Sequence, residues 1–439
     1  MYKSINSSWG RILKIEQENV WFSNRHDTLT PMPDAALTFL PYGNCRSYGD
    51  SCLNAGGIAV NTRGMDRFID FDPVSGILRC EAGVLLSDIL ELIVPQGWFL
   101  PVTPGTRFVT VGGAIANDVH GKNHHVTGTF GNHVRGFELL RSDGQRLLCS
   151  ADQQADYFSA TIGGLGLTGL ITWAEIQLRR IRGPWISAES IRYESLDEFF
   201  ALCDESDNDY EYTVSWVDCA GAGKRLGRGL FVRGNHAPAG ALSGEYSQKS
   251  RTFPFVPPIS MVNSLTLKAF NMLYYHKQIP RVALQTYHYE PFFYPLDGIL
   301  EWNRMYGPQG FYQYQCVAPT DTGKAAIAEL LNEIAASGMG SFLAVLKVCG
   351  NKTSPGMLSF PLPGVSLALD FPNRGDRLHK LFDRMDSIIA AAGGRLYPAK
   401  DGRMPGSLFR SGYPRWREFS HFIDPRFSSS FWRRIMENV

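Results

Sequence analysis

The chain has 439 residues, of which 44% are apolar and 19% are charged, and this composition excludes a disordered protein. Its 43 basic and 42 acidic residues leave a formal net charge of +1, which gives no electrostatic footprint for nucleic acid. A chain of this length is expected to form two domains.

Membrane insertion, secretion and metal binding are not indicated either. No apolar run approaches the ~20 residues that a membrane-spanning helix needs. The N-terminal segment contains Ser7, Ser8 and Arg11 and lacks the apolar core of a signal peptide. The eight cysteines are scattered without a Cys-x-x-Cys pair, which favours reduced thiols. We therefore expect a cytoplasmic protein without a metal site.

Short strands and one helix are predicted in the first part of the chain. Apolar patterning predicts four strands, at 58–61, 68–71, 77–82 and 170–178. Helical spacing predicts a helix over 86–94, capped by Ser87 or a neighbour and ended by Pro95. This mixture of elements is typical of an α+β fold.

Two glycine-rich loops interrupt the periodic pattern, at residues 41–50 and 104–125. Both combine glycine with hydroxyl and amide side chains, and the first also carries Arg46. Because glycine lacks a Cβ atom, such backbone can approach a flat or charged group, and its consecutive N–H groups form a concavity for phosphate. The two loops predict one large phosphate-bearing cofactor.

The segment Gly164–Gly169 satisfies the G-x-G-x-x-G pattern of dinucleotide-binding Rossmann domains. That fingerprint requires a strand before it and a helix after it. Here residues 152–160 look helical and the residues from 170 alternate as a strand, which is the opposite order. The favoured interpretation is that these glycines let the backbone approach the cofactor from one side.

Four histidines, at positions 120, 124, 125 and 133, could indicate zinc, because imidazole clusters are common zinc ligands. However, Gly121 and Gly128 interrupt the segment, and no cysteine or carboxylate stands at ligand spacing beside it. We expect His124, His125 and His133 to form hydrogen bonds within the loop.

The second half of the chain has a longer, more mixed pattern, and a domain boundary is expected near Arg182–Pro184. Helices are predicted over 325–336, closed by Ser337-Gly338, and over 377–392. A strand is predicted over 311–317, and its alternation places Gln313 and Gln315 on one side.

The two glycine-rich loops, together with Phe130–Arg135, resemble the FAD-dependent oxidases of the vanillyl-alcohol oxidase superfamily. Within it the resemblance is closest to the oxidase subunits of decaprenylphosphoryl-ribose 2-epimerases, and the string His120–His125 is its most specific part. Further matching segments lie at 301–308, 313–315, 359–361 and 397–401.

The resemblance implies an α+β, two-domain flavoprotein. Residues 1–181 and 395–439 would form the FAD-binding domain, and residues 182–394 a substrate-binding domain with an antiparallel sheet and flanking helices. The implied cofactor-binding residues are Gly43, Asn44, Cys45, Arg46, Ser47, Tyr48, Gly49, Pro104, Gly105, Thr106, Thr110, Val111, Gly112, Gly113, Ala116, Asn117, His120, Gly121, Asn123, Gly169, Ile171 and Tyr397.

Arg46 stands where several sugar and polyol oxidases of this superfamily carry the histidine that is covalently joined to the flavin. Arginine cannot form that bond, so the resemblance implies noncovalently held FAD. Glycine and serine flank Arg46, which favours a position at the pyrophosphate over a surface turn.

The resemblance also implies an active site. Its catalytic residues would be Lys400, His120, Tyr48 and Gln315, and its substrate-binding residues Gln313, Lys122, Lys347 and Ala368. A lysine beside a sugar hydroxyl can orient the alcohol or, if desolvation lowers its pKa, accept its proton. Lys122, Lys347 and Lys400 could instead be ordinary surface lysines. Ala368 stands where the mycobacterial epimerases have cysteine, so the pocket wall differs.

The implied reaction is FAD-dependent oxidation of a secondary hydroxyl of a polyprenyl-phosphate-linked pentose to the 2-keto sugar. A separate short-chain NAD(P)H-dependent reductase would complete the 2-epimerisation, within cell-wall or glycan biosynthesis. Two alternatives stay open: a soluble alditol or aldonolactone oxidase, and a flavin-binding sensor or scaffold without turnover. The second conflicts with the joint presence of Lys400, Gln315 and Tyr48.

The span 254–295 has two interpretations. Its many apolar side chains are interleaved with Lys268, Lys277 and Arg281, and it begins in a proline-rich stretch. It could be a mobile lid that receives an isoprenoid phosphate or lies on anionic lipid, or it could fill the core of the substrate-binding domain. The resemblance favours the lid, and with it peripheral contact with the inner membrane.

Overall fold

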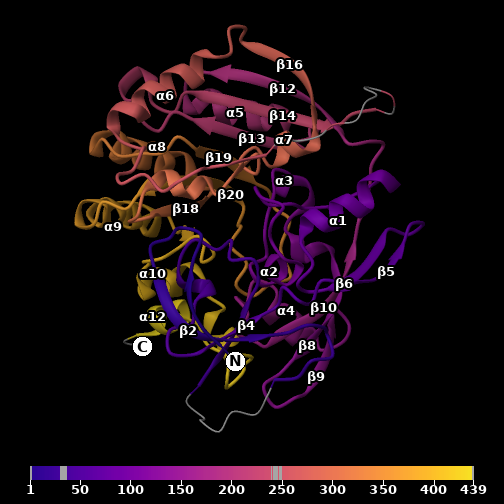
Figure 1. Ribbon diagram of the computed structural model, residues 1–439. Helices are drawn as coiled ribbons and strands as arrows, with labels where there is room; N and C mark the ends of the chain where they lie inside the picture. Colours follow the sequence, from indigo (N-terminus) through magenta and orange to yellow (C-terminus); the bar gives the residue numbers. More distant parts are fainter. Residues whose placement is uncertain (1, 30–36, 239, 241–245, 247–249, 438–439) are drawn as a thin grey trace.

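The computed structural model describes residues 2–29, 37–238, 240, 246 and 250–437. Three sheets of four or more strands form within these ranges, and the largest lies at the opposite end of the molecule from the N-terminus (Figure 1). Helices and mainly antiparallel strands are mixed along the chain, which is an α+β arrangement.

A four-stranded sheet lies near the N-terminus, and its strand order is β1-β2-β4-β3. The first two strands are antiparallel, whereas β4 runs parallel to both β2 and β3. The strands are β1 (Tyr2–Ser7), β2 (Lys14–Trp21), β3 (Phe39–Tyr42) and β4 (Ile58–Asn61).

A five-stranded antiparallel sheet follows, with the order β5-β6-β10-β8-β9. Its strands are β5 (Phe68–Asp72), β6 (Ile77–Glu81), β8 (Val134–Leu140), β9 (Arg146–Ser150) and β10 (Leu170–Gln177). The short helices between them are α1 (Leu86–Ile93), α2 (Val111–Ala116), α3 (His124–Thr127) and α4 (Ala155–Thr161). A short strand pair, β7 (Trp98–Phe99) and β11 (Arg179–Arg180), closes this part.

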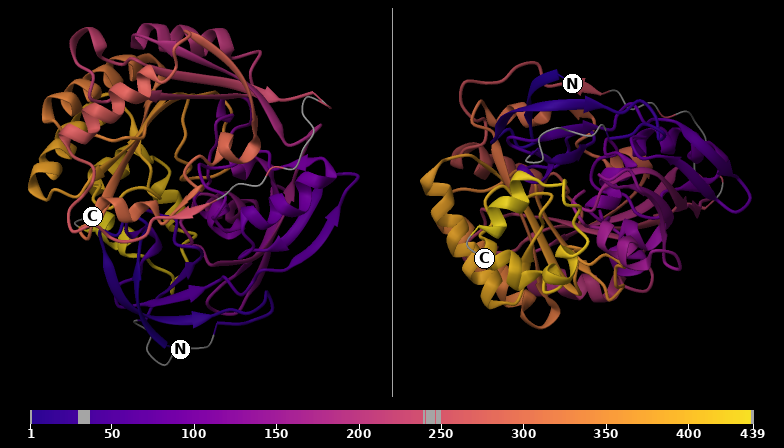
Figure 2. Two further views of the ribbon diagram at one scale, coloured as in Figure 1. Left: turned by 45° about the horizontal axis from the view of Figure 1, so that its top comes forward. Right: turned by 90° about the horizontal axis from the view of Figure 1, so that it is seen from below.

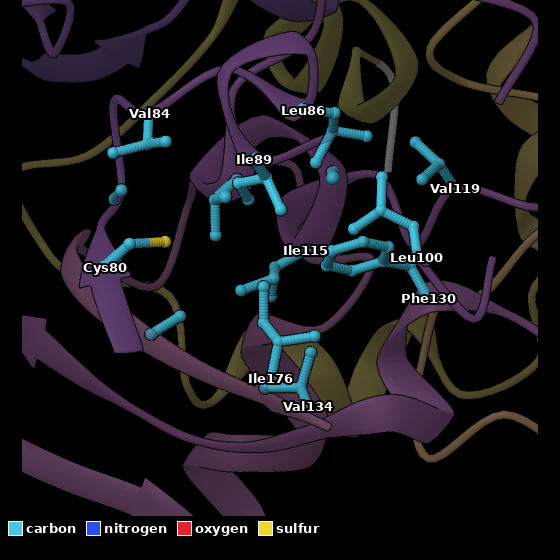
Figure 3. Packing of buried hydrophobic residues seen from close by; sticks show 14 of the residues in the cluster. Cys80, Val84, Leu86, Ile89, Leu100, Ile115, Val119, Phe130, Val134 and Ile176 are labelled. Carbon is cyan, nitrogen blue, oxygen red and sulfur yellow. The ribbon is translucent and has the colours of Figure 1, made fainter. Parts of the chain in front are cut away.

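The core of this part lies between the helices and the sheet. Ile89 of α1 and Ile115 of α2 point to the same interior as Phe130 and Ile176 (Figure 3). All four side chains are fully buried, and burying a large apolar side chain contributes about 1.5–3 kcal/mol. This packing fixes α2, and therefore the glycine-rich loop that leads into it.

The eight-stranded antiparallel sheet has the order β16-β12-β14-β13-β19-β20-β18-β21. Its strands are β12 (Trp185–Tyr193), β13 (Tyr212–Val217), β14 (Gly229–His236), β16 (Val282–His288), β18 (Phe311–Pro319), β19 (Ala344–Cys349), β20 (Gly364–Pro372) and β21 (Arg395–Leu396). A further short pair, β15 (Arg251–Thr252) and β17 (Ile299–Leu300), runs parallel beside it.

Helices cover one face of this sheet. Buried side chains of α5, α8 and α9 share a single hydrophobic cluster with alternate residues of the central strands. The helices of this region are α5 (Leu196–Ser206), α6 (Ser264–His276), α7 (Tyr289–Phe293), α8 (Thr320–Ser337) and α9 (Asp376–Ala391). The opposite face of the sheet lines the site described below.

The C-terminal segment returns to the N-terminal sheet (Figures 1 and 2). It contains α10 (Gly406–Gly412), α11 (Trp416–Ser420) and α12 (Ser430–Met436). The amide of Phe39 donates to the carbonyl of Arg426, and the amide of Ser428 donates to the carbonyl of Phe39. These contacts agree with a domain composed of residues 1–181 and 395–439, although β21 pairs with β18 of the large sheet. The domain boundaries remain a prediction.

The predicted elements are confirmed with small shifts at their ends. The helix expected at 325–336 begins earlier, at Thr320, and ends at Gly338, whose φ of 68° needs the left-handed region that glycine tolerates. Helix α1 is capped by Leu85 rather than Ser87, because the amide of Leu85 donates to the Asp88 carboxylate at 3.3 Å. Among the described residues, no helix is long and apolar enough to cross a membrane.

The G-x-G-x-x-G segment lies between α4 and β10, so the predicted helix-loop-strand order is confirmed. Gly166 and Gly169 have positive φ angles of 75° and 141°, and both line the cavity described next. A side chain at either position would strain this backbone. The pattern therefore serves close backbone approach, not a Rossmann turn.

Candidate active site

A cavity of about 710 Å³ lies between the glycine-rich loops and the open face of the eight-stranded sheet. Loops 43–48 and 103–122 supply one wall, and strands β18, β19 and β20 supply the other. Residues 295–302 border it as well. Its size falls within the range of cofactor and ligand sites.

The loop from Gly43 to Ser47 has the properties of a phosphate-binding nest. Within the described part of the chain, its five successive amides donate no hydrogen bond. Cys45 has a φ of 50°, in the left-handed region, so neighbouring N–H groups can converge. The Asn44 side chain secures the loop by donating to the carbonyl of Phe108 at 2.7 Å. These free donors fit a pyrophosphate.

The second glycine-rich loop leads into α2 and supplies the floor of the cavity. Thr110 caps the helix, since its hydroxyl accepts from the amide of Gly113 at 3.1 Å. A Cβ atom added at Gly112 would lie 3.1 Å from the Ala82 methyl group, whereas one added at Gly105 would meet no atom within 4 Å. The backbone at Gly105 therefore opens onto free space, as a cofactor-binding loop requires.

The sheet wall carries polar side chains in a regular pattern. Strand residues alternate between faces, so Gln313 and Gln315 of β18 both face the cavity, as predicted. Strand β20 presents Ser366, Ala368 and Asp370 in the same way, and Ala368 pairs with Gln315 in the ladder. This wall comes from adjacent antiparallel strands, which hold the side chains in fixed register.

Lys400, Tyr48, Gln313 and Asp370 meet at one end of this wall. The Lys400 ammonium lies 3.8 Å from the centre of the Tyr48 ring, and the Gln313 amide donates to the Asp370 carboxylate at 2.6 Å. Burial lowers the pKa of Lys400 below its ordinary value, although the Asp370 charge opposes the shift. Burial also raises the pKa of the Asp370 carboxyl. A lysine in this setting can act as an acceptor for a hydroxyl proton.

His120 belongs to the loop wall and faces Gln315 of the sheet wall. Burial lowers its pKa well below the ordinary value, and the neighbouring charges of Lys347 and Lys400 act in the same direction. The Gln315 side-chain amide lies 3.1 Å from His120 Nε2, so Nε2 accepts when the amide donates, and Nδ1 then carries the proton. Nδ1 is buried and has no partner among the described residues, which fits a ligand in the cavity.

Two lysines occupy the other end. Lys347 donates to the carbonyl of Gly121 at 2.8 Å, and Lys122 donates to the carbonyl of Phe293 at 3.3 Å. Burial, with a contribution from the Lys347 charge, lowers the pKa of Lys122 to about 8. Neither side chain is an ordinary surface lysine, because both line the cavity.

Most of the predicted site residues come together here, but three do not line the cavity: Gly49, Val111 and Asn123. A Cβ atom at Gly49 would overlap the carbonyl of Asp401, so this glycine serves loop packing. Val111 is fully buried, and the Asn123 amide donates to the carbonyl of Pro101 at 2.8 Å. Their contact with the cofactor stays a prediction, as it does for the residues that line the cavity.

Asp370, Ser366 and Trp9 also line the cavity, although no sequence motif predicts them. Alternation along the strand that contains Ala368 would have placed Ser366 and Asp370 on the same face. Trp9 belongs to no pattern of the sequence, because it reaches the cavity only through tertiary packing against Trp302 and Arg46.

The hydrogen bond within the loop that was expected for each of the remaining histidines is found for His133 but not for His125, and His124 Nδ1 is buried without a partner among the described residues. His133 Nε2 lies 3.0 Å from the carbonyl of Thr127, and His125 Nε2 lies 2.9 Å from the carbonyl of Tyr210, which is outside the loop. The described part of the chain contains no group of three or more His, Cys, Asp or Glu side chains that could hold a metal ion.

Loops that suit a pyrophosphate, around a cavity lined by lysine, tyrosine, histidine and amide side chains, indicate an oxidoreductase with a phosphate-bearing cofactor as the class of protein. A family model described as an FAD binding domain matches residues 27–150. The chain is 37% identical to the decaprenylphosphoryl-β-D-ribose oxidase of Mycolicibacterium smegmatis over 406 residues, which are 89% of this chain and 87% of the relative. The chain belongs to this family of FAD-dependent oxidases, within the vanillyl-alcohol oxidase superfamily.

Other relatives show how far the likeness extends. A Streptomyces coelicolor protein, described only by the position of its gene, is 34% identical over 373 residues, 80% of this chain and 100% of the relative. D-lactate dehydrogenase of Anaerostipes hadrus is 28% identical over 159 residues, 35% of this chain and 33% of the relative. The predictions of an α+β flavoprotein fold, of an FAD cofactor and of an oxidoreductase acting on a CH–OH group are confirmed.

Proposed function

We propose that this enzyme oxidises the 2-hydroxyl of a polyprenyl-phosphate-linked pentose to a ketone, as the first half of a 2-epimerisation. The observation that carries the proposal is the sheet wall, where Lys400 and Tyr48 adjoin amide and carboxylate groups inside the cofactor cavity. The name of the mycobacterial relative supports a phosphoribose substrate. A separate NAD(P)H-dependent short-chain reductase would return the ketone to the epimeric alcohol.

Bound FAD supplies the hydride acceptor, and residues of the protein supply position and proton handling. Lys400 holds the reacting hydroxyl and accepts its proton as the carbon loses hydride. The lowered pKa of Lys400 leaves part of its amine neutral near physiological pH, which this step requires. Gln315 and His120, joined at 3.1 Å, would hold the sugar ring beside Ala368.

The surface near the cavity supports a lipid-linked substrate. In the span 254–295, Val262 and Leu267 are buried, whereas Ile259 and Leu265 are 76% and 77% exposed. The span 254–295 is therefore only partly buried in the core of the substrate-binding domain, and part of its apolar surface is exposed. The amide of Phe253 donates to the carbonyl of Leu300, a residue that lines the cavity, so the beginning of the span adjoins the cavity. An apolar surface with basic residues fits a polyprenyl chain and peripheral contact with anionic lipid.

Anaerobic mixing with candidate sugars tests the proposal. A short-chain prenylphosphoryl pentose is expected to bleach the flavin and give a 2-keto sugar, whereas free alditols and aldonolactones leave the flavin oxidised. Bleaching by alditols or aldonolactones alone would assign the protein to the soluble oxidases. Bleaching by none of these sugars would favour a sensor or scaffold.

FAD is expected to be held without a covalent bond, because Arg46 cannot form the flavin linkage. Precipitation of the holoprotein with acid should release all of the yellow chromophore into the supernatant. Flavin fluorescence that stays with the precipitated chain would contradict this prediction.

Replacement of both Phe253 and Phe255 by serine is expected to raise the KM for a long polyprenylphosphoryl pentose at least tenfold, with little change for a short-chain analogue. The reason is that a long isoprenoid would lose apolar contacts that a short one never makes. Phe255 is 62% exposed, so folding should survive.

Serine at Val74 and Leu148 is the matched control, since these exposed apolar residues lie on the five-stranded sheet part, away from the cavity. The KM values of this control variant should match those of the native enzyme for both the long and the short substrate. Equal effects of the Phe253 and Phe255 changes on long and short substrates would assign the span to general architecture.

A further inference from the structure

Arg46 is a cation on the cavity wall that lies against aromatic rings. Its guanidinium carbon is 4.1 Å from the centre of the Trp9 ring and 5.5 Å from that of Phe108. Stacking of this kind fixes the plane of the guanidinium but uses none of its N–H donors. The side chain is thus held in place with its hydrogen-bonding groups free.

No protein group in the described ranges takes those donors. Arg46 Nε is buried without a partner, and no carboxylate lies within ion-pair distance of the guanidinium. The two nearest acids have other donors: Asp297 accepts from the amide of Arg107 at 2.9 Å, and Glu301 pairs with Arg304 at 3.7 Å. Arginine stays charged at any working pH, and a desolvated charge without a partner is costly. An anion from outside the chain would therefore compensate the charge of the Arg46 guanidinium.

The guanidinium lies where the second glycine-rich loop meets the segment 295–302. It contacts the Phe108 ring of that loop, and the charges of Asp297 and Glu301, which belong to the segment and line the cavity, act on it. Tyr48, two residues further along, contacts Lys400 at 3.8 Å. The free amides of residues 43–47 can hold the FAD pyrophosphate without help from the Arg46 side chain.

From this placement we infer that Arg46 binds the phosphate that joins the sugar to its lipid, and so selects phosphate-linked pentoses. The inference rests on the proposed function. In such a substrate the phosphate is bonded to C1, the carbon next to the one that is oxidised. An anion bound by Arg46 thus lies beside the hydroxyl at Lys400, with the lipid leaving past Trp9 and the segment 295–302. The planar fork of arginine suits two phosphate oxygens, which a lysine would bind less well.

Binding to the FAD-loaded enzyme tests this role without turnover. Calorimetry would compare farnesyl monophosphate with farnesol for the native chain, R46Q, R46K and R135Q. Native enzyme is expected to prefer the phosphate by roughly 10- to 100-fold, as one or two charge-assisted hydrogen bonds allow. R46Q should lose this preference and R46K should keep part of it. R135Q, which changes an exposed arginine of the five-stranded sheet part that does not line the cavity, should keep all of it.

A second measurement separates the substrate phosphate from the FAD pyrophosphate. The FAD dissociation constants of R46Q and R46K should equal that of the native chain. If R46Q loses FAD and still prefers farnesyl monophosphate, Arg46 serves the cofactor and the inference is wrong.

The outcomes also distinguish this inference from the proposed function. An Arg46-dependent phosphate preference, with no pentose bleaching the flavin, would overturn the proposed oxidation and leave the anion site in place. Flavin bleaching by a prenylphosphoryl pentose, with unchanged phosphate preference in R46Q, would leave the oxidation in place and remove Arg46 from substrate binding.

Discussion

Lys400→Ala is expected to slow reduction of the flavin by a prenylphosphoryl pentose roughly 100-fold or more, the loss typical of removing a general base. The reason is the position of the Lys400 amine, which lies against the Tyr48 ring inside the cavity and interacts with the charge of Asp370. Stopped-flow absorbance under anaerobic conditions measures the rate of flavin reduction directly.

The dependence of this rate on pH provides an independent check. The neutral amine accepts the proton, so the native rate should rise with pH through the pKa of Lys400, which burial holds below that of free lysine. This rise should be absent in Lys400→Ala, while FAD binding survives. Lys380→Ala, on the exposed face of α9, should reduce its flavin at the native rate. A native rate in Lys400→Ala would show that Lys400 only lines the pocket.

Gly105→Trp is expected to weaken FAD binding by about 100-fold or more without unfolding the chain. A Cβ atom at Gly105 meets no atom within 4 Å, and Gly105 lines the cavity, so an indole at this position would extend into the space that FAD needs. Titration of the apoprotein with FAD, followed by flavin fluorescence, gives the dissociation constant.

Gly183→Trp is the matched control. A Cβ atom at Gly183 also meets no atom within 4 Å, but Gly183 does not line the cavity. This variant should bind FAD as the native protein does, and both variants should show native circular dichroism. Native affinity in Gly105→Trp would place the cofactor elsewhere in the cavity.

Local sequence patterns predict much of the fold. The helix at 377–392 and the strand at 311–317 follow from periodicity, which reports the burial of one face and needs no knowledge of the partner. The cap of α1 is predicted only as Ser87 or a neighbour, and the sequence does not indicate that the Leu85 amide donates to the Asp88 carboxylate. Helix caps depend on individual hydrogen bonds, which periodicity does not record.

The site depends on contacts between distant parts of the sequence. Lys347 meets the carbonyl of Gly121 across 226 positions, and Gln315 meets His120 across 195. Secondary-structure propensity and residue spacing do not predict contacts between residues so far apart in the sequence. Only the resemblance to known oxidases predicts that these residues share one site. Asp370 is an example of a residue that sequence analysis misses, because neither a motif nor the resemblance indicates it. Its carboxylate nevertheless accepts a hydrogen bond from the Gln313 side-chain amide.

The cavity has one wall of loops from the first third of the chain and one wall of strands from its second half. A dinucleotide and a sugar placed between them would each contact both walls, and each would restrict how the walls move. Thermodynamic linkage then makes their affinities reciprocal: the factor by which bound cofactor tightens the sugar equals the factor by which bound sugar tightens the cofactor. Any such coupling would appear as slower loss of the cofactor when the sugar is present.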